Sequence, residues 1–89
     1  MENLDDYMPA IFRICEKKGW KKDWVRGGCY LHLEVSEFIE SLRGKGDDPP
    51  EKEVADILFC LLAIMGHYRL SMNDAIAQLK RIISQLDPK

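Results

Sequence analysis

The sequence predicts an all-α protein, an antiparallel bundle of about four helices forming one domain over residues 1–89. Three observations indicate this class. Apolar residues recur at helical spacing in four segments, and no stretch alternates as a half-buried strand does. The connections between the segments are short, which favours antiparallel neighbours. Hydrophobic residues make up 46% and charged residues 31% of the chain, as in soluble globular domains.

The first two helices are expected over about residues 6–18 and 29–43. In the first, Pro9 is acceptable only within the first turn, and Gly19 ends the helix. The intervening segment GWKKDWVRGG is predicted to be a loop or a short turn. Gly44 ends the second helix, whose narrow apolar stripe consists of Leu31, Val35, Phe38 and Leu42.

The third helix is expected to begin with Asp48 as its N-cap and prolines in its first turn, and to run to about Tyr68. Ser71 is the expected N-cap of the fourth helix. The apolar residues of that helix keep the helical period almost to its end: Met72, Ile76, Leu79, Ile83 and Leu86.

The third helix also predicts an assembly. Residues 54–65 read VADILFCLLAIM, apolar nearly all the way round, which is typical of a helix buried on every side. An 89-residue chain has too few partner helices to surround it. We therefore expect a homodimer or homotetramer, with this helix near the interface.

Charge and composition exclude several classes of partner. The formal net charge of −2 provides no basic surface for a nucleic acid polymer. No apolar run reaches the ~18–20 residues of a membrane span, and the acidic start MENLDDYM lacks a targeting core, so we expect a cytoplasmic protein. The three cysteines include no C-x-x-C pair, so neither a disulfide framework nor a zinc site is expected.

The candidate functional residues are two acidic pairs, Glu34 with Glu37 and Glu53 with Asp56. Residues three apart share one helix face, within roughly 5–6 Å. The fifteen residues between Glu37 and Glu53 let the pairs meet if the helices pack antiparallel, although the slide between the helices stays open. Converging carboxylates repel, so either some stay protonated or a cation holds them together. Hard oxygen ligands without histidine or cysteine favour Mg²⁺ or Mn²⁺ over zinc.

An acidic pair at this spacing is more often a solvated helix face, and Glu34 with Glu37 taken alone fits that interpretation. Glu53 and Asp56 favour the metal interpretation, because they are the only charged residues on an otherwise apolar stretch of helix. Considered together, the four carboxylates predict a metal site.

The motifs that carry these residues resemble a known family. E-V-S-E at 34–37 and E-V-A-D at 53–56, followed by ILFCLLAI, are similar to the E-x-x-E…E-x-x-D signature of the MazG-like all-α nucleoside triphosphate pyrophosphohydrolases. The resemblance covers roughly residues 20–86. It implies an all-α dimer or tetramer, Mg²⁺ dependence, and hydrolysis of a nucleotide between its α- and β-phosphates to monophosphate and pyrophosphate. It also implies four metal ligands: Glu34, Glu37, Glu53 and Asp56.

The chemistry agrees with this implication, because phosphoanhydride hydrolysis needs neutralised phosphate charge and a deprotonated water. Glu37, set further from the apolar stripe, is favoured over Glu34 as the catalytic base. The family carries a lysine and, four residues later, an asparagine that contact the nucleotide; Lys80 matches, but Ser84 does not, which leaves substrate preference and turnover open.

Three further residues are candidates for substrate binding. Family members often stack the base on an aromatic residue before the second helix, so Trp20 and Trp24 are candidates, although each could instead cap the core. Cys60 lies one turn after Asp56 and could touch the sugar or simply pack.

The leading hypothesis is a Mg²⁺-dependent enzyme that removes unwanted (deoxy)nucleoside triphosphates from the nucleotide pool. The first alternative is an enzyme like phosphoribosyl-ATP pyrophosphatase, which shares the fold and carboxylate chemistry. The second is a non-catalytic helical module that dimerises or binds nucleotide.

Overall fold

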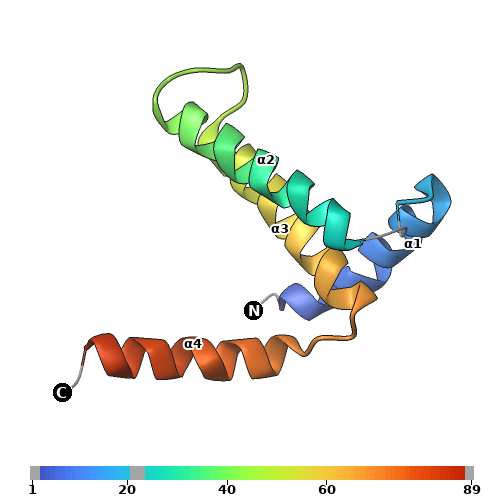
Figure 1. The fold of residues 1–89 in the computed structure, drawn as a ribbon, viewed down its shortest axis with the longest axis vertical. Helices are drawn as coiled ribbons and strands as arrows, with labels where there is room; N and C mark the ends of the chain where they lie inside the picture. The colour runs from blue at the N-terminus through green and yellow to red at the C-terminus, as the bar shows by residue number, and fades with distance from the viewer. Residues whose placement is uncertain (1–2, 21–23, 88–89) are drawn as a thin grey trace.

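The protein is all-α, as the sequence predicts (Figure 1). The computed structural model describes residues 3–20 and 24–87, with side chains in the second segment from residue 30 onward. A 3-10 turn, η1, is followed by four α-helices, and the described residues contain no strand. The elements are η1 (Leu4–Tyr7), α1 (Met8–Lys18), α2 (Trp24–Leu42), α3 (Pro50–His67) and α4 (Met72–Leu86).

Local signals account for both ends of α1. Asn3 caps the preceding 3-10 turn by accepting a hydrogen bond from the Asp5 amide at 3.0 Å. Pro9 lies in the first turn of α1, where a missing N–H costs nothing. Gly19 ends the helix in the left-handed region at φ 68°, as predicted. The predicted start near Asp6 is two residues early, because that residue belongs to the 3-10 turn.

The predicted start of the second helix is wrong by five residues. We expected a loop up to Gly28, whereas α2 begins at Trp24 and includes both Gly27 and Gly28. Glycine weakens a helix by only about 1 kcal/mol per residue, so a long amphipathic helix tolerates two of them near its N-terminus. The predicted stop is confirmed, since α2 ends at Leu42 and Gly44 follows at φ 77°.

The predicted N-cap is wrong for α3 and correct for α4. Asp48 is not the N-cap of α3. Pro49 occupies that position in extended backbone, without a side-chain cap, because its ring and that of Pro50 set the entry into the helix. Ser71 caps α4 as predicted, with its Oγ accepting a hydrogen bond from the Asp74 amide at 3.1 Å.

Helices α2 and α3 form an antiparallel hairpin, and α1 packs on α3 near its C-terminal end (Figure 1). The buried apolar cluster lies between α1 and α3: Ile11, Cys15, Leu62 and Ala63, flanked by Met8, Phe59 and Met72. Val54 and Leu61 of α3 remain more than a third exposed, so the chain alone does not bury this apolar helix on every side. Helix α4 extends away from the C-terminal end of α3 (Figure 1).

No single helix among the described residues is long and apolar enough to cross a membrane. Taken together, α3 and α4 have the length and apolar composition of a span, but the pair is bent by 118° at the break between them.

Candidate metal centre

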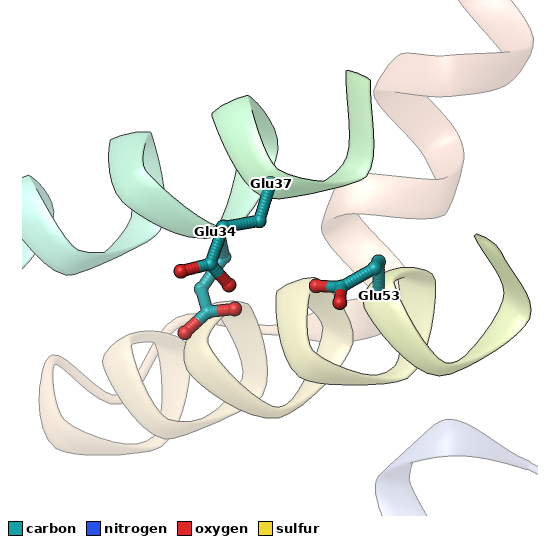
Figure 2. A group of neighbouring side chains, drawn as sticks. All are labelled: Glu34, Glu37 and Glu53. Atoms are coloured by element: carbon teal, nitrogen blue, oxygen red, sulfur yellow. The ribbon is translucent and has the colours of Figure 1, made fainter. Parts of the chain in front are cut away.

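Three glutamates from the α2–α3 hairpin meet between the two helices (Figure 2). Glu34 and Glu37 come from successive turns of α2, and Glu53 comes from the first turn of α3. One carboxylate oxygen of each lies within 4.8 Å of the others. The antiparallel packing therefore brings both predicted acidic pairs to the same part of the hairpin, and the slide between the helices selects these three for closest approach.

The cluster is graded from buried to exposed. Glu53 keeps only 7% of its surface, Glu34 is half-buried, and Glu37 is exposed. The Oε2 atoms of Glu34 and Glu53 are buried and have no hydrogen-bond partner. A buried carboxylate oxygen without a donor is destabilising. These two atoms are therefore the places in the described structure where a bound cation would relieve a cost.

The pKa values of Glu34 and Glu53 reflect this environment. Burial is the main cause of the raised pKa of Glu34, followed by the charges of Glu37 and Asp56 and by the hydrogen bond that protonated Glu34 shares with Glu37. Burial also raises the pKa of Glu53, again reinforced by Glu37 and Asp56. Both shifts favour the neutral carboxyl in the absence of a cation.

Asp56, the fourth predicted ligand, lies next to this cluster but points its carboxylate at a cation of the chain itself. Lys52 Nζ donates to Asp56 Oδ2 at 2.7 Å, and the same ammonium lies 3.9 Å from Asp48 Oδ2. Lys52 is not among the site residues predicted from the sequence. The signal was present, because a lysine four residues before an aspartate on a helix is a common ion pair.

Cys60 lies one turn beyond Asp56 on α3 and is partly buried. Burial raises the pKa of its thiol, and the charges of Glu34 and Asp56 raise it further. The thiol is therefore neutral and borders the carboxylates, a position compatible with either of its predicted roles.

The two candidate stacking residues differ in what the structure describes. Trp20 follows the end of α1 and is half-exposed; its ring meets Phe59 of α3 edge-on at 6.5 Å, with Lys18 Nζ 5.5 Å from its centroid. The indole therefore packs against α3 while half of its surface stays exposed. The side chain of Trp24 lies outside the described residues.

The structure does not bring Lys80 and Ser84 to the carboxylates. Both are exposed on α4, which begins beyond the C-terminal end of α3. Glu53 lies in the first turn of α3, and the helix rises about 21 Å over the fourteen residue steps from Glu53 to His67. Helix α4 makes no extensive contact with α2 or α3 and diverges from the hairpin (Figure 1), so Lys80 and Ser84 do not lie beside the carboxylates of the same chain.

The donor set fits a hard divalent cation. Three carboxylates on two rigid helices supply up to six oxygens, two of which are buried without partners. No histidine or cysteine belongs to this trio, so zinc is disfavoured. The cluster can hold a divalent cation.

Comparison with known proteins yields one informative relative. The chain is 27% identical over 93 aligned positions to a phosphoribosyl-ATP pyrophosphatase of Geobacter metallireducens, covering 91% of this chain and 85% of that protein. No protein-family model matches the chain, and no solved structure gives a significant match.

Proposed function

We propose that this protein is a Mg²⁺-dependent nucleotide pyrophosphohydrolase. It hydrolyses the bond between the α- and β-phosphates of a nucleotide, which gives a nucleoside monophosphate product and pyrophosphate. The observation that carries the proposal is the cluster of Glu34, Glu37 and Glu53, with two buried oxygens that lack partners. The similarity to a nucleotide pyrophosphatase over most of the chain supports the same reaction.

The proposed role of each glutamate follows from its burial. Glu34 and Glu53 would hold the cation, because their Oε2 atoms are the buried and unpartnered ones. When bound, Mg²⁺ supplies positive charge that neutralises phosphate oxygens. Glu37 is exposed to solvent beside them and accepts the proton of the attacking water. Asp56 would complete the ligand set only by releasing Lys52, whose ammonium would then be available to phosphate oxygens.

The base-binding part of the site is proposed around Trp20. Its half-exposed indole is held edge-on by Phe59 and therefore offers a fixed surface for stacking. Cys60 borders the carboxylates as a neutral thiol and contacts the sugar.

Two substrate classes remain for the same chemistry. The motif resemblance favours canonical or non-standard (deoxy)nucleoside triphosphates. The relative's name favours phosphoribosyl-ATP as a second candidate, and Ser84 in place of the asparagine expected of the first class is compatible with it. Both require cleavage between the α- and β-phosphates, so pyrophosphate is the common product. For either substrate we propose a cytoplasmic location.

The decisive experiment measures pyrophosphate release from a panel of nucleoside triphosphates, deoxynucleoside triphosphates and phosphoribosyl-ATP, with Mg²⁺ and with EDTA. Glu53→Gln removes the negative charge of one carboxylate of the cluster. Glu51→Gln makes the same change at an exposed position two residues earlier. We expect turnover by the wild type and Glu51→Gln only, and only with Mg²⁺.

Two results would contradict the proposal. One is undiminished turnover by Glu53→Gln. The other is the absence of pyrophosphate with every nucleotide of the panel, which, if nucleotide still binds, would favour the non-catalytic module.

A further inference from the structure

Lys52 lies beside the carboxylate cluster and is shared between two aspartates. Its Nζ donates to Asp56 Oδ2 at 2.7 Å and lies 3.9 Å from Asp48 Oδ2. The three residues are spaced four apart along the start of α3. The side chain of Lys52 is 52% exposed. The ammonium is therefore accessible from solvent while it is bound to the fourth predicted metal ligand.

The same ammonium acts on the buried part of the cluster. Burial raises the pKa of Glu53 most, and the charges of Glu37 and Asp56 raise it further. The charge of Lys52 opposes these effects and lowers the pKa of Glu53. Lys52 therefore supplies positive charge that partly balances the carboxylates before a divalent cation binds.

The requirements of the helix do not explain why a lysine occupies this position. Lys52 lies in the first turn of α3, where the helix dipole favours acidic residues and disfavours cations. A lysine that precedes its acidic partner by four residues is also the less favourable order of such a pair. An exposed ion pair shifts an equilibrium by at most about fivefold. The contact between Lys52 and Asp56 is therefore weak enough to be exchanged.

We propose that Lys52 is an exchangeable counter-ion, which pairs with Asp56 in the metal-free protein and with a substrate phosphate once a divalent cation occupies the cluster. The inference rests on the proposed function, because it assumes that the carboxylates hold such a cation. Asp56 becomes available to the cation when Lys52 leaves it. The released ammonium then forms a charge-assisted hydrogen bond with phosphate, which is stronger than the exposed pair that it replaces.

This exchange makes the binding of metal and the binding of phosphate depend on each other. Lys52 opposes the binding of a cation alone, because it competes for Asp56. It favours the binding of phosphate to the cation-loaded protein, because it supplies a donor there. Removing the ammonium should therefore tighten the first equilibrium and weaken the second. A general change in net charge has the same two signs, so the test needs a second lysine as a reference.

The test compares Lys52→Met with Lys45→Met, which removes the same charge from the connection between α2 and α3. Lys45 is exposed and lies 3.8 Å from Glu40 Oε2, outside the cluster. Isothermal titration calorimetry measures the binding of Mg²⁺ alone, and then the binding of pyrophosphate at saturating Mg²⁺.

For Lys52→Met, we expect the Mg²⁺ affinity to rise by up to about fivefold and the pyrophosphate affinity to fall by about tenfold or more. Lys45→Met should change either affinity by less than about twofold, because solvent and salt screen an exposed charge outside the site. Lys52→Arg keeps the positive charge and should retain pyrophosphate binding.

A second measurement uses the wild type alone and covers the case in which a variant does not fold. In NMR spectra of isotope-labelled protein, the Cε resonance of Lys52 should shift on addition of Mg²⁺ and again on addition of pyrophosphate, whereas that of Lys45 should not. An unmoved Lys52 resonance would overturn the inference, and so would equal affinities for Lys52→Met and Lys45→Met or a Lys52→Met variant that binds both ligands more weakly. Each of these results leaves the metal site intact. A wild type that binds no divalent cation would instead overturn the proposed function, and this inference with it.

Discussion

The substitution Glu53→Gln tests the metal centre without relying on any substrate. It keeps the shape of the side chain and removes the charge of the most buried member of the cluster. Burial and the neighbouring charges raise the pKa of Glu53 in the folded protein. Its ionised carboxylate therefore destabilises the metal-free folded state at neutral pH. We therefore expect the metal-free variant to melt at a higher temperature than the metal-free wild type at pH 7.5.

Mg²⁺ should reverse this order. A ligand at ten times its dissociation constant stabilises the folded state by about 1.4 kcal/mol. For a domain of 89 residues, each kcal/mol moves the thermal midpoint by about 4–8 °C, so the wild type should gain about 6–11 °C. Glu53→Gln removes one of the two carboxylates with a buried, unpartnered oxygen and should gain little, since Glu34 is then the only one of that pair left to hold the cation.

The assay is differential scanning fluorimetry with EDTA and with a Mg²⁺ titration, using Glu51→Gln as the matched control. The control should follow the wild type in both conditions, because Glu51 is exposed and outside the cluster. A wild type that gains no stability from Mg²⁺ or Mn²⁺, or a Glu53→Gln variant that gains as much as the wild type, would refute the metal site.

Three further predictions follow from named contacts. Lys52→Met should tighten Mg²⁺ binding by up to about fivefold in isothermal titration calorimetry, because Asp56 loses a cation that competes with the metal. The gain is limited because an exposed ion pair of this kind is weak. An unchanged or weaker affinity would show that Asp56 is not a metal ligand. In EDTA, the raised pKa values of Glu34 and Glu53 mean that their contribution to stability is fully present below the ordinary value of 4.5 and is lost as the pH rises through the folded-state pKa. The thermal midpoint of the wild type should therefore fall relative to that of Glu53→Gln as the pH rises above 4.5, and parallel pH curves would contradict this assignment. Leu62→Ala, in the cluster between α1 and α3, should cost about 2–4 kcal/mol in urea unfolding, whereas Leu70→Ala at an exposed position should change little.

The elements of the fold were predictable wherever a local signal marks their ends. The left-handed glycine after α1, the proline in its first turn and the serine cap of α4 act through one or two neighbouring residues, so they are legible in sequence. The start of α2 was not, because the glycines at 27 and 28 argue locally for a loop and a long helix absorbs their cost. Asp48 failed as a cap because Pro49 takes the position that the aspartate would need.

The sequence by itself determined the all-α class, the four helices and the two acidic pairs, since each depends on the helical repeat within a single segment. Only the tertiary structure decided which carboxylates meet. The slide of α2 along α3 depends on side-chain packing across the hairpin, and it brings Glu34, Glu37 and Glu53 together while Asp56 turns to Lys52. The tertiary structure also decided that α4 stands apart with its apolar face uncovered. The helical repeat shows that such a face exists, but the angle at which the chain leaves α3 determines what can cover it.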